Sequence, residues 1–230
     1  MATAIITGGS RGLGQALAAD LAGDGWDVVL DGRDAEELRD AAAAIGPHAH
    51  PVAGDVADPG HRAALIERAT VLGGLTLLVN NASDLGPSPL PHLRDLPLDA
   101  FERLLRTNVV APVALAQACL PQLATAGGAI VNVTSDAAVE GYEGWGGYGS
   151  SKAALEQASH VLAAEEPDVR VWWFDPGDMR TAMHQDAFPG EDISDRPAPG
   201  SVVPAVRRLL AERPPSGRVR AADLLAVADP

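Results

Sequence analysis

Cysteine is almost absent from this sequence, and positive charge is sparse. Cys119 is the only cysteine among 230 residues, so neither an internal disulfide nor a cysteine-based metal cluster can form. The 17 Lys and Arg residues face 31 Asp and Glu residues, which gives a formal charge of −14. No stretch rich in Lys or Arg offers the basic face that nucleic acid or an anionic membrane surface requires. We therefore expect neither nucleic acid nor a membrane as a partner.

Long hydrophobic runs and targeting signals are also missing. No apolar run approaches the roughly 20 residues that cross a bilayer. Residues 1–8 start as a short strand without the basic region of a secretory signal, so the cytoplasm is the expected location. The histidines form no helical pair with a nearby acid, and we expect no metal site. The balance of 47% apolar and 21% charged residues is typical of a globular chain with a full core.

Short apolar runs alternate with helical stretches rich in Ala and Leu. Strands are expected at 4–7, 27–31, 50–53, 75–80, 129–134, 169–174 and 217–220. Helices are expected at 13–22, 35–45, 60–72, 98–123 (disturbed at Pro112 and Pro121), 150–164 and 202–212. The strands are continuous apolar runs, as in a sheet covered on both faces. The pattern predicts one α/β domain, 1–230, with a doubly wound, mostly parallel Rossmann-like sheet and helices on both faces.

A glycine-rich loop, Thr7-Gly8-Gly9-Ser10-Arg11-Gly12-Leu13-Gly14, follows the first strand and opens the first helix. Glycines let the backbone turn sharply and approach a pyrophosphate closely. The free N–H groups and the positive end of the helix dipole then face that anion. The order of strand, glycine loop and helix therefore predicts a dinucleotide-phosphate site.

A second group of residues has the types needed for proton transfer. Tyr148 and Lys152 are four residues apart, so on a helix they share one face. A lysine cation beside a phenol lowers the phenol pKa and makes it a better acid/base near neutral pH. Ser135 ends a strand 13 residues before Tyr148, and Asn108 lies in the long helix 27 residues before Ser135. The strand end places Ser135 at the edge where such sheets bind their ligands.

The TGxxxGxG spacing and the set Asn108, Ser135, Tyr148 and Lys152 resemble the short-chain dehydrogenases/reductases over most of residues 3–181. The resemblance implies that Tyr148 exchanges a proton with a carbonyl or alcohol oxygen and that Ser135 hydrogen-bonds the same oxygen. Lys152 would lower the pKa of Tyr148 and hold the nicotinamide ribose. Asn108 would support a water in a proton relay to Lys152. The nicotinamide would carry the hydride chemistry.

Further segments resemble cofactor-contacting stretches of the same family. Asn80-Asn81-Ala82-Ser83 resembles its NNAG segment with Ser83 in place of glycine, which would strain the backbone if a positive φ were required. Asp55-Val56 resembles the adenine-contacting pair, and 176–181 resembles the PGxxxT stretch beside the nicotinamide. The expected cofactor contacts are Thr7, Gly8, Ser10, Arg11, Gly12, Leu13, Gly14, Arg33, Asp55, Val56, Asn81, Tyr148, Lys152, Pro176, Gly177, Met179 and Thr181.

The end of the second strand predicts NADP(H) as the cofactor. Relatives that use NAD carry an acid at the position of Gly32, whereas here that position is neutral and Arg33 follows it. Arg11 provides a second guanidinium for a 2′-phosphate. Asp31, one residue earlier, is expected to point the other way because side chains alternate along a strand. A slip of one residue in the strand would instead favour NAD.

The substrate side is expected to come from two segments. The loop at about 182–200 is the expected lid, and 140–145 is the expected opposite wall. Tyr142, Trp145 and Phe188 would form an apolar pocket for a ring or chain carbonyl.

The remaining aromatic and apolar residues have simpler expected roles. His184 is expected to be exposed, and the run 172–174 is expected to pack in the core. The helices 98–123 and 150–164 carry more apolar residues than one sheet face needs, and the family resemblance implies that they pair in a homodimer or homotetramer.

The leading hypothesis is an NADP(H)-dependent carbonyl reductase or alcohol dehydrogenase acting on a small molecule. A catalytically silent NADP(H)-binding regulatory or interaction protein is the alternative from another class. Reduction of an imine or enone on the same fold is a third reading that the sequence leaves open.

Overall fold

The computed structural model describes residues 2–226. Its centre is a seven-stranded, fully parallel sheet in the order β3-β2-β1-β4-β5-β6-β7. The strands are β1 (Thr3–Ile6), β2 (Asp27–Gly32), β3 (Ala49–Ala53), β4 (Leu77–Asn80), β5 (Ala129–Val133), β6 (Arg170–Asp175) and β7 (Gly217–Arg220). The predicted doubly wound sheet is therefore confirmed, and its order reverses between β1 and β4, where such sheets bind ligands.

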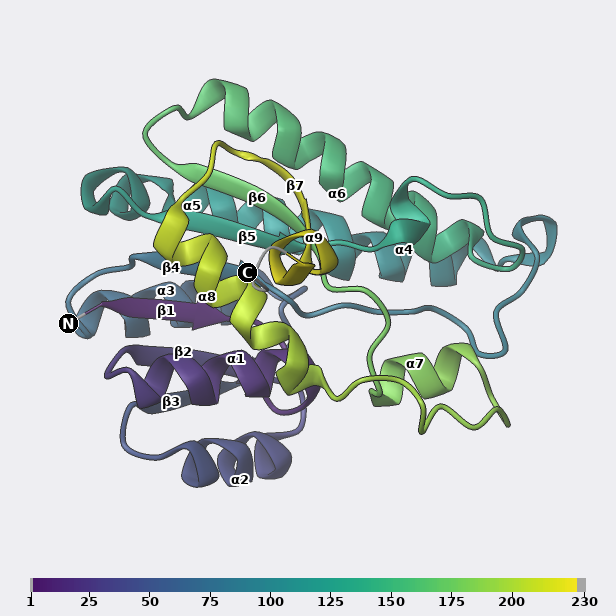
Figure 1. Ribbon diagram of the computed structural model, residues 1–230, viewed down its shortest axis with the longest axis horizontal. Helices are drawn as coiled ribbons and strands as arrows, with labels where there is room; N and C mark the ends of the chain where they lie inside the picture. Colours follow the sequence, from purple (N-terminus) through teal and green to yellow (C-terminus); the bar gives the residue numbers. More distant parts are fainter. Residues whose placement is uncertain (1, 227–230) are drawn as a thin grey trace.

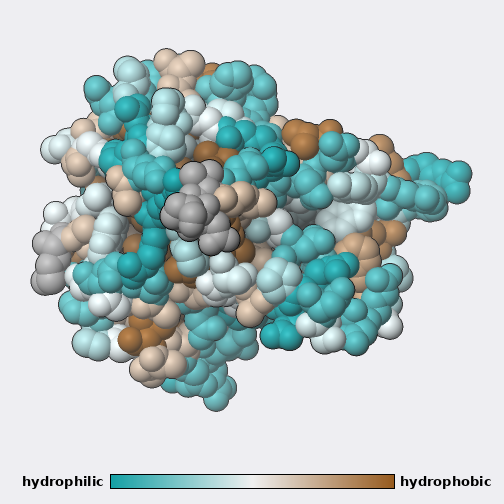
Figure 2. All heavy atoms as spheres, viewed as in Figure 1, coloured by the Kyte–Doolittle hydropathy of each residue, from teal (hydrophilic) through white to brown (hydrophobic). Residues whose placement is uncertain are grey.

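Nine α-helices accompany the strands within the described residues, and the last of them follows β7. They are α1 (Gly12–Gly23), α2 (Ala35–Ile45), α3 (Pro59–Val71), α4 (Leu98–Leu105), α5 (Ala111–Ala126), α6 (Gly146–Glu165), α7 (Ala182–Ala187), α8 (Val203–Glu212) and α9 (Ala221–Ala226). In Figure 1, α1 and α8 lie in front of the strands, while α7 and its loops are set apart beyond the carboxyl ends. Hydrophilic side chains cover most of this face of the molecule, with small apolar patches between them (Figure 2).

Capping residues fix where the nucleotide-side helices begin. The Asp34 carboxylate caps α2 by accepting the N–H groups of Glu36 and Glu37 at 2.9 and 3.0 Å. Asp58 accepts the N–H of Gly60, and Pro59 occupies the first turn of α3, where its missing N–H is harmless.

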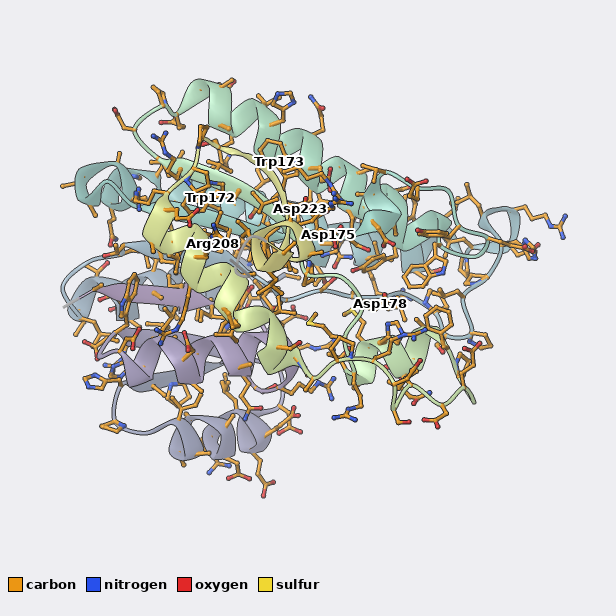
Figure 3. All side chains as sticks on the ribbon, viewed as in Figure 1. Trp172, Trp173, Asp175, Asp178, Arg208 and Asp223 are labelled. Atoms are coloured by element: carbon orange, nitrogen blue, oxygen red, sulfur yellow. The ribbon has the colours of Figure 1, made fainter. Side chains whose placement is uncertain are left out.

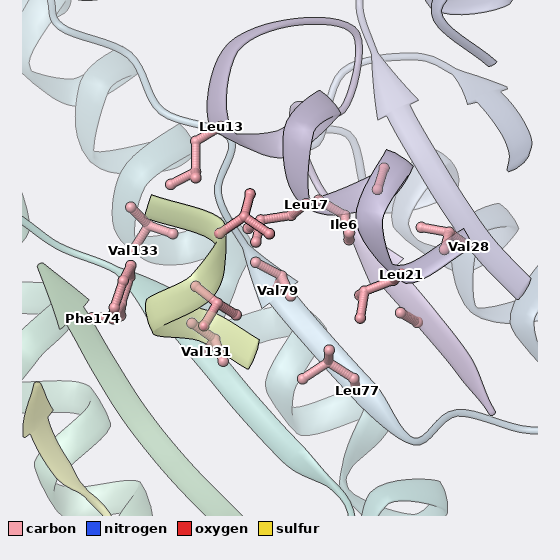
Figure 4. Close-up of a cluster of buried hydrophobic side chains, with 14 of the residues drawn as sticks. Ile6, Leu13, Leu17, Leu21, Val28, Leu77, Val79, Val131, Val133 and Phe174 are labelled. Atoms are coloured by element: carbon pink, nitrogen blue, oxygen red, sulfur yellow. The ribbon is translucent and has the colours of Figure 1, made fainter. Parts of the chain in front are cut away.

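The strands bury side chains on both faces, which divides the core in two. Ile6, Leu30 and Val79 belong to the cluster under α1 and α8 (Figure 4), whereas Ile5 and Leu78 belong to the cluster under α3 and α5. Successive side chains of a strand point to opposite faces, so continuous apolar runs fill both layers. The aromatic run of β6 is part of this core, as predicted: Trp172 and Phe174 are fully buried, and Trp173 nearly so.

The long helical region keeps its direction but contains a π-helical turn, Arg106–Val110, between α4 and α5. Pro112 has no N–H, and its ring would clash with the carbonyl four residues earlier, which belongs to Asn108. The predicted disturbance at Pro112 thus takes the form of a bulge at Asn108.

One expectation about hydrophobic length needs correction. The continuous helix Leu98–Ala126 is long and apolar enough to cross a membrane by length and composition. In the fold, Leu115, Cys119 and Leu123 of this helix are buried in the core cluster beside the sheet. Part of the apolar surface of this helix is therefore buried in the core of the fold.

Candidate active site

A cavity of about 1500 Å³ opens at the carboxyl ends of the strands. The glycine loop and the end of β2 line its nucleotide end, and the residues that line this end lie within 8–16, 31–37 and 54–56. The loops after β4, β5 and β6 form its substrate end, and the residues that line this end lie within 83–88, 135–145 and 178–188. Asp175 ends β6 and Asp178 follows it toward α7 (Figure 3).

The glycine loop fits a dinucleotide pyrophosphate. Gly8 and Gly12 have φ angles of +66° and +61°, which favour glycine. A Cβ on Gly14 would lie 2.3 Å from the Gly8 carbonyl oxygen, so a side chain there would displace the loop. The first N–H groups of α1 lack helical partners and remain available to an anion.

Most of the predicted cofactor contacts line this cavity. Those that do are Gly8, Ser10, Arg11, Gly12, Leu13, Arg33, Asp55, Val56, Asn81, Tyr148, Lys152, Pro176, Gly177, Met179 and Thr181. Thr7 and Gly14 do not line it. The Thr7 hydroxyl oxygen accepts the N–H groups of Asn81 and Ala82, each at 3.0 Å, so Thr7 positions the next loop instead.

Asp31 has both carboxylate oxygens engaged within the chain. One accepts the N–H of Gly8, and the other lies 3.2 Å from Nε2 of His61 on α3. Strand β2 continues through Gly32, which pairs with Ala53. Asp31 does not point away from the nucleotide end as expected, because it lines the cavity beside the glycine loop. Asp31 therefore holds the glycine loop in place by accepting the Gly8 N–H.

Glu37 is a residue at the nucleotide end that sequence reasoning missed. Its carboxylate accepts the Ser10 hydroxyl at 3.2 Å and lies 3.9 Å from the Arg11 guanidinium. Arg11 is 65% exposed, and Arg33 is an exposed residue that also lines the cavity. Two arginines and one glutamate thus surround this part of the cavity.

Tyr148 and Lys152 lie together on α6, which begins at Gly146, four residues earlier than predicted. The Lys152 Nζ lies 5.4 Å from the centre of the Tyr148 ring and donates to the Val133 carbonyl at 2.8 Å. Burial lowers the pKa of Lys152 to about 8. The chain contains no other lysine.

The pKa of Tyr148 moves opposite to the expected direction. Burial raises it most, the neighbouring Ser83 side chain lowers it, and the charges of Asp175 and Asp136 raise it further. Desolvation of the phenol thus outweighs the influence expected of Lys152 in the protein alone. The phenol is protonated at neutral pH and available as a proton donor.

Ser135 gives its hydroxyl proton to a neighbouring side chain. Its Oγ donates to Asp136 Oδ1 at 2.9 Å and accepts the Ala137 N–H at 3.2 Å. The other oxygen of Asp136 accepts the Tyr142 hydroxyl at 2.9 Å. Asp136 and Tyr142 therefore form one hydrogen-bonded group with Ser135 at the cavity wall.

Asn108 is buried in the π-helical turn and does not line the cavity. Its Oδ1 accepts the Asp84 N–H and the Ser83 hydroxyl, and its Nδ2 donates to the Asp84 carbonyl and to Ser151. Ser83 has no positive φ, so the backbone strain considered for a serine at this position is absent. Asn108 thus fixes the loop that carries Ser83 against Tyr148.

A network from β7 reaches the same region, which the sequence did not reveal. Arg218 donates to Glu156 and to Asp175 at 3.0 Å each, and to the Ser135 carbonyl at 3.2 Å. Glu156 lies one turn beyond Lys152 on α6 and accepts the Thr134 hydroxyl. Arg218 therefore links three segments that converge on the cavity.

Aromatic side chains line the substrate end, as predicted. The Trp145 ring centre lies 5.9 Å from that of Phe188 and 5.7 Å from that of Tyr148. His184 is not exposed as expected: its side chain is only 10% exposed and stacks on Phe188 at 4.9 Å. The short helix α7 turns His184 inward, a direction that loop composition alone did not indicate. Within residues 2–226 no group of three or more His, Cys, Asp or Glu could hold a metal ion.

Comparison with known proteins identifies the family. The family model for short chain dehydrogenases matches residues 2–192, and this chain belongs to that family. The chain spans a little under two thirds of the length of the first curated relatives that it matches.

Individual relatives agree. The chain is 34% identical to the short chain dehydrogenase asqE of Emericella nidulans over 71% of its own length and 64% of that protein's. It is also 34% identical to serine 3-dehydrogenase of Rhizobium radiobacter, over 78% and 72% of the two chains. A short chain dehydrogenase structure from Shigella flexneri, complexed with NADP, superposes with a TM-score of 0.89 at 30% identity, over 96% of this chain and 97% of that one.

Proposed function

We propose that this protein interconverts a carbonyl and a secondary alcohol with NADP(H), with Tyr148 as the general acid/base. The observation that carries the proposal is the position of Tyr148, Lys152 and Ser135 on the wall of the cavity whose other end is the glycine loop. When bound, the nicotinamide would supply or accept the hydride.

The chain's own residues would handle the proton and the orientation. Tyr148 is buried and protonated, so it can donate to a carbonyl oxygen that becomes an alcohol. Lys152, with a pKa of about 8, is mostly charged at neutral pH and would stabilise the phenolate left behind. Ser135 would position the substrate oxygen once its hydroxyl turns from Asp136.

The preference for NADP(H) rests on the nucleotide end. Arg11 and Arg33 line the cavity and would bind a 2′-phosphate, while Asp31 is engaged by Gly8 and His61. The structural neighbour from Shigella flexneri is complexed with NADP, which supports the same choice. Glu37 opposes it, because its charge lies beside Arg11.

The test is a carbonyl panel with NADPH and NADH, run on the wild type and on Tyr148→Phe. We expect reduction with at least tenfold preference for NADPH, and a loss of at least about 100-fold in kcat in Tyr148→Phe with unchanged NADPH affinity. Arg33→Ala should remove most of the cofactor preference, and Glu37→Gln should increase it. Unchanged turnover in Tyr148→Phe would refute the mechanism, and NADPH binding without any turnover would favour the silent regulatory protein.

A further inference from the structure

The Ser135 hydroxyl faces a conflict that points to the kind of substrate. A serine hydroxyl has one proton, and here Asp136 holds it at 2.9 Å while the Ala137 N–H occupies the oxygen. A hydrogen bond to an ionised carboxylate is stronger than one to a neutral carbonyl. A neutral substrate would therefore compete poorly with Asp136 for the Ser135 proton.

A cationic group on the substrate removes this conflict. An ammonium group would replace the hydroxyls of Ser135 and Tyr142 on the Asp136 carboxylate with a charge-assisted contact. The Ser135 hydroxyl could then turn and donate to the reacting oxygen. Because Asp136 lies one hydrogen bond from Ser135, the ammonium must sit close to the reacting carbon.

The surroundings favour a cation as well. Asp84, Asp136, Asp178 and Asp186 all line the substrate end. The Arg180 guanidinium at this end donates to the Ser194 carbonyl at 3.3 Å, and the His184 ring lies 3.9 Å from Asp178.

Two further features add to the attraction. The aromatic rings of Tyr142 and Trp145, whose centres are 6.5 Å apart, add faces that attract a cation. A net charge of −14 also raises the local concentration of cations around the protein.

We propose that the substrate is an amino alcohol, or the matching amino ketone, whose ammonium group is on the carbon next to the reacting carbon and binds Asp136. This inference rests on the proposed function, because it assigns the reacting oxygen to Ser135 and Tyr148. It makes Asp136 a specificity residue. The carboxylate keeps the hydrogen bond from Ser135 until a cationic group binds the carboxylate in its place. The Trp145 and Phe188 rings would hold an apolar or aromatic remainder of the substrate.

The test compares two probes that differ in one group, 2-amino-1-phenylethanol and 1-phenylethane-1,2-diol. Both are alcohols, so neither can react with protein saturated with NADPH, and their binding is measured by calorimetry at pH 7. The wild type should bind the amine at least tenfold more tightly. In Asp136→Asn, which keeps the side-chain shape and removes the charge, the two affinities should fall within threefold of each other.

Glu140→Gln is the matched control, because Glu140 is an exposed acid on the same segment that does not line the cavity. It should keep the full preference for the amine. Equal binding of both probes to the wild type, a comparison that needs no variant, would refute the inference. A preference that survives in Asp136→Asn would refute it too.

Failure of the proposed function gives a different result. Absence of NADPH binding or of carbonyl reduction sensitive to Tyr148→Phe would overturn that function. The probe comparison can then be made on the protein alone, since the contacts of Asp136 with Ser135 and Tyr142 exist without a cofactor. If carbonyl reduction that depends on Tyr148 is present but the protein binds the amino alcohol and the diol equally, only the inferred substrate class is overturned.

Discussion

The two ends of the cavity differ in what determines their shape, which is backbone at the nucleotide end and side chains at the substrate end. At the nucleotide end, the shape comes from backbone: Gly8 and Gly12 adopt positive φ, and Gly14 packs against the Gly8 carbonyl. At the substrate end, the shape comes from side chains such as Asp136, Trp145 and Phe188, which belong to separate loops. The nucleotide end therefore depends on local spacing, and the substrate end depends on long-range contacts.

The largest effect is expected where a long-range contact holds the reacting region. Arg218→Met would leave Glu156 and Asp175 as nearly buried carboxylates without their cation, which should cost about 3 kcal/mol of unfolding free energy. The kcat should also fall, because the Ser135 carbonyl loses a donor. Chemical denaturation and steady-state kinetics measure both.

Arg218→Lys is the control for that variant. It keeps the charge and loses the forked geometry, so it should recover part of the stability. The NADPH affinity of well-folded protein should not change in either variant, since Arg218 does not line the cavity. A variant with wild-type stability and kcat would show that the network has no role.

A methyl group in the glycine loop should have the next largest effect. Gly14→Ala places a Cβ 2.3 Å from the Gly8 carbonyl oxygen, so the loop must move and NADPH affinity should fall about 100-fold. Quenching of the four tryptophans reports this affinity. Gly23→Ala in the same helix meets no atom within 4 Å and should bind NADPH like the wild type. Equal affinities in the two variants would contradict a backbone-built nucleotide end.

The burial of Lys152 predicts how stability varies with pH. Its pKa in the folded protein is about 8, below the value of about 10.4 expected when unfolded, so the unfolded state binds more protons between these values. The unfolding free energy of the wild type relative to Lys152→Met should therefore rise between pH 8 and 10, by at most about 1.4 kcal/mol per pH unit. Taking the difference cancels the opposite contribution of Cys119, whose pKa burial raises to about 12. A flat or falling difference would contradict the buried position of Lys152.

The smallest effect is expected at Ser83, where the two ends meet. Ser83→Ala removes a neighbouring hydroxyl that lowers the pKa of Tyr148, so the pH profile of alcohol oxidation should shift upward, with a change in rate well below about tenfold. Ser83→Gly should behave the same way, because position 83 has no positive φ. A difference between these variants would indicate that the backbone, and not the hydroxyl, matters here.

The same contrast explains what could be predicted from the sequence. The alternation of strands and helices, the glycine loop and the Tyr148–Lys152 spacing are local patterns in the sequence. The parallel sheet that the alternation predicted is confirmed, and so is the family. The pairing of Asp31 with Gly8 and His61, and of Arg218 with Ser135, joins residues that lie 23 to 83 positions apart. No periodicity or spacing encodes such pairs, because they depend on how helices and strands pack.

Residues of the site differ in how clearly the sequence signals them. The chain has one lysine, and it occupies the fourth position after Tyr148, which is a strong compositional hint. The inward turn of His184 and the contact of Glu37 with Ser10 had no such hint. The serine at position 83, where the family has glycine, is visible in the sequence, but its hydrogen bond to Asn108 depends on the fold.

The central claim is that Lys152 lies buried where the nucleotide and substrate ends meet and takes part in both. Because it is the only lysine, labelling lysine with ¹³C gives one side-chain NMR signal that needs no assignment. We predict that this signal titrates with a pKa of about 8 and shifts when NADPH is added. A pKa near the ordinary value of about 10.4, with no response to NADPH, would contradict the account.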